Sequence, residues 1–135
     1  MSHDLVFIDT NIWVYAYSET ELSKQHIVQS LLRPETTRLS TQVINELVWV
    51  LIRKYKVQVS LVQQLQMRLC QNFQVANINT TTITSALDIV KKHNISYWDA
   101  LMVTSAKEQH CKTFLTEDLN HGQLIAGVRI QNPFS

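Results

Sequence analysis

Four carboxylates lie at the ends of predicted apolar strands or on apolar faces of predicted helices. Asp9 and Asp118 each follow a short apolar run of the kind that forms a buried strand. Glu46 and Asp99 each share a predicted helix face with apolar residues three or four positions away. Those neighbours are Val43, Leu47 and Val50 for Glu46, and Met102, Val103 and Ala106 for Asp99. An unpaired charge on an apolar face is costly, so these four acids are the first candidates for a functional site.

Each acid also has an ordinary structural explanation. Asp9 stands before an amphipathic stretch at 12–17 and could cap that helix. Asp99 lies at the third helical position after Ser96, which is the spacing of a capping box. Asp118 could be a turn residue, and Glu46 could lie at the exposed edge of its helix stripe. The functional interpretation rests on the four acids occurring together.

Four carboxylates in one cleft repel one another and raise each other's pKa values, and a divalent cation removes that penalty. Ligation by oxygen alone points to Mg²⁺ or Mn²⁺ rather than zinc. Cys70 and Cys111 are isolated in the sequence, so we expect two buried free thiols and no zinc site. Gly122 and Gly127 are the only glycines, which excludes a glycine-rich phosphate loop.

Strand and helix patterns alternate along the whole chain, which predicts an α/β fold with a mostly parallel sheet. Strands are expected at 5–8, 36–39, 75–78, 113–115 and 128–130. Helices are expected at 12–17, 21–32, 42–56, 60–70, 82–92 and 96–108. Asp9 and Asp118 then follow parallel strands, at the sheet edge where open α/β folds bind their ligands.

Composition is that of an ordinary globular domain. The 135 residues are 45% hydrophobic and 17% charged, with no apolar run long enough to span a membrane, so we expect one cytoplasmic domain over residues 1–135. The net charge is +1, from 12 basic and 11 acidic residues. Setting the four candidate acids aside leaves seven acidic residues, an excess of five positive charges that suits a polyphosphate substrate. Candidate backbone contacts are Arg33, Arg38, Arg53, Lys54, Lys91 and Lys92.

Four blocks of sequence, in this order, resemble the acidic motifs of PIN-domain ribonucleases. The blocks are Phe7-Ile8-Asp9-Thr10-Asn11, Ser40-Thr41-Gln42-Val43-Ile44-Asn45-Glu46, Ser96-Tyr97-Trp98-Asp99-Ala100 and Leu115-Thr116-Glu117-Asp118. The resemblance runs from Asp4 to about Ile130, and the size and block order look most like VapC-type toxins of bacterial toxin–antitoxin pairs. It implies a PIN-like three-layer α/β/α fold with a central, mostly parallel sheet.

The resemblance also implies site residues and partners. In that family three acids hold a divalent metal and a fourth contributes, and the matching positions are Asp9, Glu46, Asp99 and Asp118. Thr10, Asn11 and Thr116 match polar positions that support the metal waters or the phosphate. The implied activity is Mg²⁺- or Mn²⁺-dependent hydrolysis of RNA by an endoribonuclease. The implied partner is an antitoxin whose short segment covers a groove near the active site.

Other functions remain open at this point. A PIN nuclease could act on DNA, or process RNA without a toxin role, and a non-catalytic binding module could keep the same fold. Phosphotransfer domains also place an acid after the first strand. A haloacid-dehalogenase phosphatase, however, needs a second acid where this chain has Asn11, and a receiver domain needs an acidic pair before the first helix.

Two further expectations concern Glu117 and the surface. Side chains alternate along a strand, so Thr116 and Asp118 should face one side and Glu117 the other, which leaves Glu117 outside the metal site. Trp13 and Tyr17 lie four apart on a predicted helix, and an exposed aromatic pair would suit a protein partner. We therefore expect a homodimer, the commonest assembly.

Overall fold

A six-stranded sheet forms the centre of the computed structural model, which describes residues 4–135. The strand order is β3-β2-β1-β4-β6-β5, and every neighbouring pair is parallel except β5 with β6. The strands are β1 (Val6–Ile8), β2 (Thr37–Ser40), β3 (Gln74–Ala76), β4 (Thr113–Leu115), β5 (Leu124–Ile125) and β6 (Val128–Gln131). Both faces of β1 and β4 are covered, which explains the apolar residues of these two strands.

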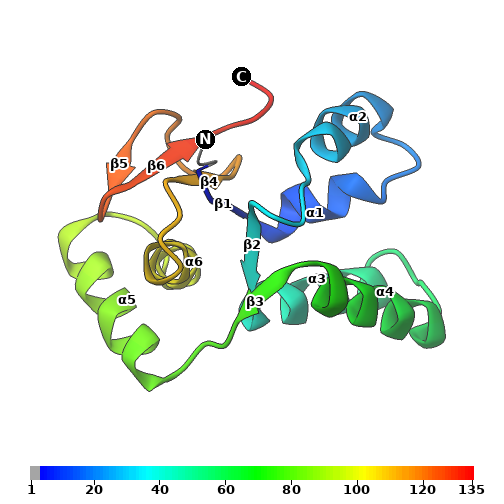
Figure 1. Ribbon diagram of the computed structural model, residues 1–135, viewed down its shortest axis with the longest axis horizontal. Helices are drawn as coiled ribbons and strands as arrows, with labels where there is room; N and C mark the ends of the chain where they lie inside the picture. Colours follow the sequence, from blue (N-terminus) through cyan, green and yellow to red (C-terminus); the bar gives the residue numbers. More distant parts are fainter. Residues whose placement is uncertain (1–3) are drawn as a thin grey trace.

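Helices cover both faces of this sheet. They are α1 (Thr10–Ala16), α2 (Leu22–Leu31), α3 (Thr41–Arg53), α4 (Val59–Asn72), α5 (Thr80–Lys92) and α6 (Tyr97–Glu108). Figure 1 shows α5 and α6 on one side of the strands and α1 to α4 on the other, with α6 nearer the sheet than α5. The predicted three-layer α/β/α architecture with a mostly parallel sheet is confirmed.

The starts of α3 and α5 follow from local capping chemistry. The Ser40 side chain accepts a hydrogen bond from the Val43 N–H at the start of α3, and the Asn79 side chain accepts one from the Thr82 N–H at the start of α5. Hydroxyl and amide oxygens at these positions satisfy N–H groups that have no partner inside the helix. The observed starts, at Thr41 and Thr80, fall within two residues of the predicted ones.

The strand order in the sheet changes direction at the boundary between β1 and β4. From β1 the chain moves to β2 and β3 on one side, and it returns to β4 on the other side of β1. In register, Ile8 of β1 pairs with Leu115 of β4, so the residues that follow the two strands emerge side by side. A crevice at such a reversal point is the usual ligand site of an open α/β sheet.

Several local expectations were wrong. Cys111 is buried, and burial raises the pKa of its thiol to about 12, but Cys70 is exposed. Trp13 is fully buried, with its ring 5.2 Å from that of Phe73, so the expected exposed pair with Tyr17 does not exist. The short strand β5 was not predicted.

Within residues 4–135, no helix is both long and apolar enough to cross a membrane.

Candidate metal centre

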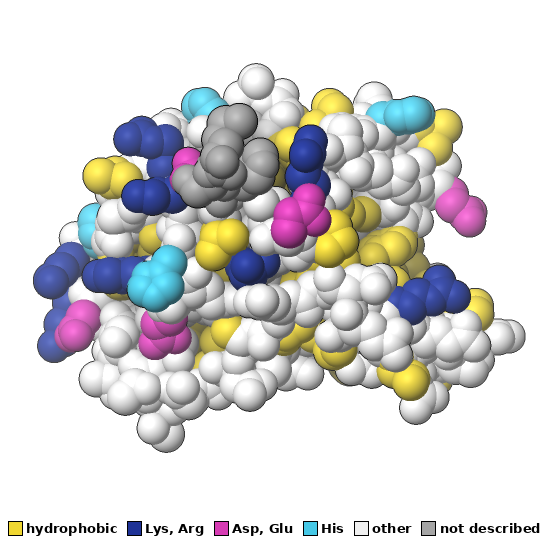
Figure 2. Space-filling view, viewed as in Figure 1, with side chains coloured by type: hydrophobic (Ala, Val, Ile, Leu, Met, Phe, Trp, Pro, Cys, Tyr) yellow, Lys and Arg dark blue, Asp and Glu magenta, His cyan; other side chains and the backbone are white. Residues whose placement is uncertain are grey.

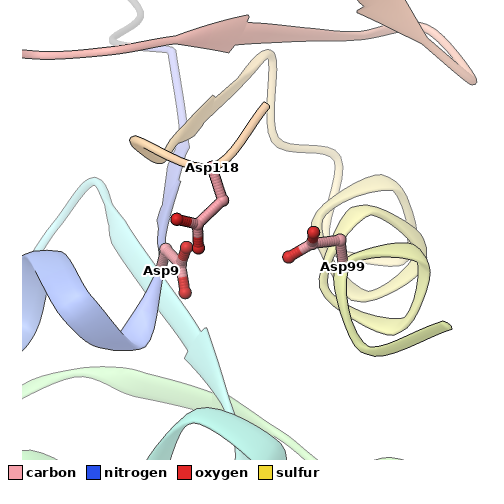
Figure 3. A group of neighbouring side chains, drawn as sticks. All are labelled: Asp9, Asp99 and Asp118. Atoms are coloured by element: carbon pink, nitrogen blue, oxygen red, sulfur yellow. The ribbon is translucent and has the colours of Figure 1, made fainter. Parts of the chain in front are cut away.

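Three of the four predicted acids converge at the crevice between β1 and β4. Asp9, Asp99 and Asp118 each offer one carboxylate oxygen, and these oxygens lie within 4.8 Å of one another. Figure 3 shows Asp9 at the end of β1 and Asp118 on the turn after β4, with Asp99 reaching toward them from α6. Segments that are far apart in sequence therefore supply the three carboxylates.

Asp9 occupies the N-cap position of α1 without using its side chain as a cap. Its backbone N–H donates to the Leu115 carbonyl at 3.0 Å, which continues the pairing of β1 with β4. Its carboxylate oxygen Oδ2 instead accepts a hydrogen bond from the Thr116 hydroxyl at 2.7 Å. The carboxylate of this buried residue is therefore turned toward the crevice.

Thr116 connects two of the acids. Besides donating to Asp9, its hydroxyl oxygen accepts a hydrogen bond from the Asp118 N–H at 3.1 Å. Thr116 is fully buried, whereas Asp118 is exposed at the rim. One hydroxyl thus fixes the orientation of the Asp9 carboxylate and the backbone that carries Asp118.

Asp99 lies in the first turn of α6. Its N–H donates to the side chain of Ser96, the N-cap residue, at 3.0 Å. The N-terminal end of a helix carries a partial positive charge that favours a carboxylate nearby. The helix start therefore both orders the backbone at Asp99 and lets its side chain reach the crevice.

Glu46 lies outside the group of three but beside it. Its carboxylate accepts a hydrogen bond from the Thr10 hydroxyl at 2.8 Å and another from the Gln42 side-chain amide at 3.1 Å. The same amide of Gln42 donates to the Trp98 carbonyl at 3.1 Å, which ties α3 to the start of α6. Glu46 is thus held in one orientation by groups that flank Asp9 and Asp99.

Gln42 was not predicted to belong to this site. Its spacing of four residues from Glu46 on α3 was the available signal, because residues four apart on a helix are neighbours. The predicted supporting residues divide into two kinds: Thr10 and Thr116 hold carboxylates, whereas Asn11 is exposed on α1.

The electrostatics of the site favour a bound cation. Burial raises the pKa of Asp9 to about 7, the Thr116 hydrogen bond opposes this rise, and the charges of Asp118 and Asp99 add to it. The pKa of Asp99 is also raised, mainly by burial and further by Asp118 and Glu46. In the described chain, no lysine or arginine forms an ion pair with any of the three aspartates. An all-oxygen set with no internal counter-charge fits Mg²⁺ or Mn²⁺.

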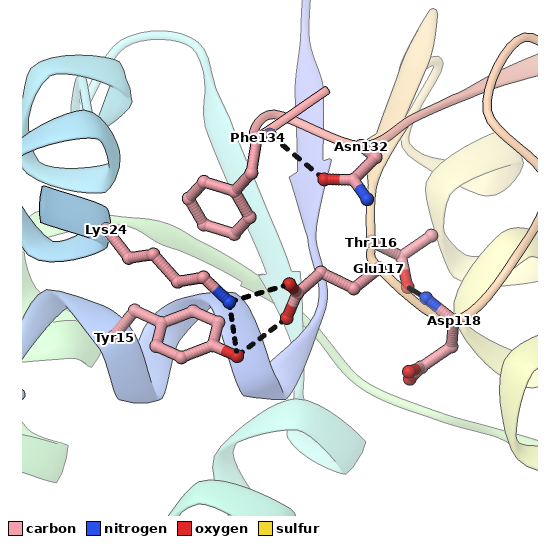
Figure 4. Close-up of polar contacts among 7 residues, drawn as sticks. All are labelled: Tyr15, Lys24, Thr116, Glu117, Asp118, Asn132 and Phe134. Atoms are coloured by element: carbon pink, nitrogen blue, oxygen red, sulfur yellow. Dashed lines mark hydrogen bonds and ion pairs between the residues drawn. The ribbon is translucent and has the colours of Figure 1, made fainter. Parts of the chain in front are cut away.

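Glu117 points away from this site, as Figure 4 shows. Its two carboxylate oxygens accept hydrogen bonds from the Tyr15 hydroxyl at 2.7 Å and from the Lys24 ammonium at 3.0 Å. The side chains of residues 116 and 117 therefore alternate as expected: Thr116 contacts the acidic site, and Glu117 faces α1 and α2.

One predicted substrate contact is wrong. Arg38 is buried on β2, where its guanidinium donates to the carbonyls of Glu35 and Thr37 at 3.3 and 3.1 Å. Arg53 is exposed and stacks over the Trp49 ring, with 5.4 Å from the guanidinium carbon to the ring centroid. Arg53 is therefore available to a substrate and Arg38 is not.

The fold is shared with several solved structures, among them a toxin–antitoxin complex and a toxin. A toxin–antitoxin complex from Klebsiella pneumoniae has a TM-score of 0.70 at 20% identity, over 95% of this chain and 97% of that chain. VapC20 of Mycobacterium tuberculosis, described as a toxin that cleaves the sarcin–ricin loop, has a TM-score of 0.69 at 17% identity, over 92% and 98%. FitAcB from Neisseria gonorrhoeae has a TM-score of 0.68 at 18% identity, over 96% and 99%.

These TM-scores establish a common fold. No curated protein sequence matches the chain significantly. The family model of the PIN domain, however, matches residues 6–124, which include all four candidate acids. Because this match covers most of the sequence, the chain belongs to the PIN-domain family.

Proposed function

We propose that this chain is a Mg²⁺- or Mn²⁺-dependent endoribonuclease and the toxin of a toxin–antitoxin pair. The observation that carries the proposal is the group of three aspartates with no internal counter-charge, at the ligand-binding edge of a PIN domain. Toxins with the same fold, one of them described as cleaving the sarcin–ricin loop, support the choice of RNA as substrate and of a toxin role.

The proposed metal ligands are Asp9, Glu46, Asp99 and Asp118, of which Glu46 lies beside the group formed by the other three. A divalent ion held there supplies positive charge that activates water and stabilises the charge developing on a phosphodiester. Thr116 keeps the Asp9 carboxylate turned toward the crevice, and Thr10 does the same for Glu46. Asn11, which is exposed on α1, is the proposed contact for the substrate phosphate.

The first experiment compares RNA cleavage by the purified protein with that by an Asp9→Asn variant, with Mg²⁺ or with EDTA. We expect the wild-type protein to cut RNA only with metal, and the variant to be inactive. Asp88→Asn is the matched control, because it removes an exposed acid of α5 that pairs with Lys91 at 3.9 Å. Cleavage that persists in EDTA or in the Asp9→Asn variant contradicts the proposal.

The same assay separates the alternatives. Cleavage of DNA in preference to RNA would indicate a PIN nuclease with another substrate. RNA binding without cleavage would indicate a non-catalytic module. Inducible expression in bacteria tests the toxin role: the native protein should arrest growth, and the Asp9→Asn variant should not.

An apolar groove is the proposed docking site of the antitoxin. The groove, of about 530 Å³, lies between the end of α1 and the pair α3–α4, and its lining includes Tyr17, Tyr55, Leu61 and Arg68. Figure 2 shows hydrophobic side chains recessed at the right of the view, between the α1–α2 side and the α3–α4 side. Leu61→Asp should abolish co-purification with the product of a short reading frame immediately upstream, and leave RNA cleavage intact.

A homodimer is also proposed, on a surface other than the one expected from sequence. Ile83 and Leu87 lie four residues apart on α5 and are 39% and 48% exposed. Burying such a pair against a second copy would remove apolar surface from water. Sedimentation should show a dimer at micromolar concentration and a monomer for Leu87→Glu, and a wild-type monomer would contradict this part.

A further inference from the structure

A second polar cluster lies on the side of the turn after β4 that faces away from the candidate metal centre (Figure 4). We call it the Lys24 cluster, and it consists of Tyr15, Lys24, Glu117 and Phe134. The Lys24 ammonium donates to Glu117 at 3.0 Å and to the Tyr15 hydroxyl at 3.3 Å, and the Tyr15 hydroxyl donates to Glu117 at 2.7 Å. The ammonium also lies 4.5 Å from the centre of the Tyr15 ring and 5.0 Å from that of Phe134.

Four separate parts of the chain meet in this cluster. Tyr15 comes from α1, Lys24 from α2, Glu117 from the turn after β4 and Phe134 from the C-terminal end (Figure 4). The rings of Tyr15 and Phe134 pack edge to face at 5.5 Å, so the ammonium is enclosed by aromatic surface on two sides. The Lys24 side chain is only 30% exposed, which is low for a lysine on a surface helix.

The cluster is connected to the acidic site through the backbone. Glu117 lies between Thr116, which donates to the Asp9 carboxylate, and Asp118, whose N–H donates to Thr116. A displacement of Glu117 therefore moves both neighbours. Holding the Glu117 side chain on the far side of the turn keeps the Thr116 hydroxyl and the Asp118 carboxylate on the near side.

We propose that Lys24 is a positioning residue for the metal centre, acting through Glu117 to fix the turn that carries Thr116 and Asp118. The proposal rests on the proposed function only in taking this acidic group to bind a divalent metal. Helix α2 contributes no residue to the acidic site, but through the contact of Lys24 with Glu117 it affects the affinity of that site for metal.

Metal affinity distinguishes positioning from a simple charge effect. If Lys24 acted only as a nearby positive charge, Lys24→Met would strengthen Mn²⁺ binding, because it removes a charge that repels the ion. If Lys24 positions the turn, the same substitution weakens binding. Methionine retains an unbranched side chain to pack on the two rings, so the comparison isolates the ammonium.

The experiment measures the Mn²⁺ dissociation constant by electron paramagnetic resonance, together with the melting temperature, for the wild-type protein and four variants. Lys24→Met, Tyr15→Phe and Glu117→Gln should each weaken Mn²⁺ binding by about threefold to tenfold. This is less than the roughly tenfold to hundredfold effect of removing groups that bond metal ligands directly, because these residues act through the turn. Tyr15→Phe changes no charge and removes one hydroxyl. Lys91→Met, which breaks an exposed lysine–aspartate pair on α5, should bind Mn²⁺ like the wild-type protein.

Hydrogen exchange measured without metal tests the proposal independently of RNA cleavage. Hydrogen exchange of the Asp118 amide should be faster in Lys24→Met than in the wild-type protein, because that N–H is bonded to the Thr116 hydroxyl on the same turn. Unchanged or tighter Mn²⁺ binding by Lys24→Met, or unchanged exchange at Asp118, overturns the proposal. A lower melting temperature with wild-type Mn²⁺ affinity also overturns it. RNA that stays intact while Mn²⁺ affinity follows the prediction rejects the proposed endoribonuclease function and leaves the positioning role standing.

Discussion

Replacing Asp9 with asparagine should stabilise the metal-free protein. Asp9 is 3% exposed, and its pKa is raised from 3.8 to about 7, first by burial and then by the charges of Asp118 and Asp99. The folded chain therefore resists ionising this group, whereas the unfolded chain does not. Asparagine carries no charge, and its side-chain oxygen can still accept the hydrogen bond from Thr116.

The size of the effect follows from the pKa difference. One pKa unit corresponds to about 1.4 kcal/mol, so an ionised Asp9 lowers the free energy of unfolding by about 4 kcal/mol above pH 7. Because the folded-state pKa of this acid is raised, its ionisation lowers the free energy of unfolding. The penalty is absent below pH 4, grows as pH rises from 4 to 7, and is complete above 7. Between pH 5 and pH 8 the stability gap between Asp9→Asn and wild type should widen by about 3 kcal/mol.

The assay is thermal and urea unfolding in EDTA at pH 5, 6, 7 and 8, for wild type and Asp9→Asn. At pH 8 the variant should melt about 10–15 °C higher, given the usual change in melting temperature per kcal/mol for a domain of this size. Added Mn²⁺ should stabilise the wild-type protein at pH 8 and have little effect on the variant, because the ion compensates a charge that the variant lacks.

Two results would refute this reasoning. Equal stability of wild type and Asp9→Asn at pH 8 without metal would mean that the Asp9 carboxylate is neutralised within the protein. A gap that narrows from pH 5 to pH 8 would mean that ionised Asp9 stabilises the fold, as the partner of a buried cation would.

Three further outcomes follow from the same geometry. Glu46→Gln should abolish RNA cleavage and leave the metal-free melting temperature unchanged or raised, since glutamine can still accept from Thr10; a large fall would indicate a structural contact. At saturating Mg²⁺, Asp118→Asn should lower kcat less than Asp9→Asn, because Asp118 is exposed at the rim, and the reverse order would contradict that ranking. Gly127→Ala should cost about 1 kcal/mol in urea unfolding, because residue 127 has a φ of +84°, and wild-type stability would show that the turn relaxes.

The sheet and most helices were predictable because their signals are local. Buried parallel strands are short and continuously apolar, so the runs ending at Ile8 and Leu115 could be located without tertiary information. The convergence of Asp9 and Asp118 follows from the rule that parallel strands present their carboxyl ends at one edge. Ser96 marks the start of α6, and with it the position of Asp99, by its capping chemistry.

Features that depend on how elements face one another were not predictable. Helical spacing places Trp13 and Tyr17 on neighbouring turns, but it does not say that α1 turns Trp13 into the core. The β5–β6 hairpin closes on Ala126 and Gly127, both with positive φ, and alanine at such a position gives no turn signal in sequence. The contact of Lys24 with Glu117 joins residues 93 apart, and no local pattern encodes it.

The two neighbouring acids after β4 show how the chain distributes its own cations. Glu117 receives an ammonium and a hydroxyl, so its charge is compensated within the fold. Asp118, one residue later, joins two other carboxylates that receive neither lysine nor arginine within residues 4–135. A site that served stability alone would be expected to share the available positive charge, since repulsion among acids destabilises the folded state. Compensating Glu117 while leaving Asp9, Asp99 and Asp118 uncompensated is the arrangement expected where an external divalent ion supplies the missing charge.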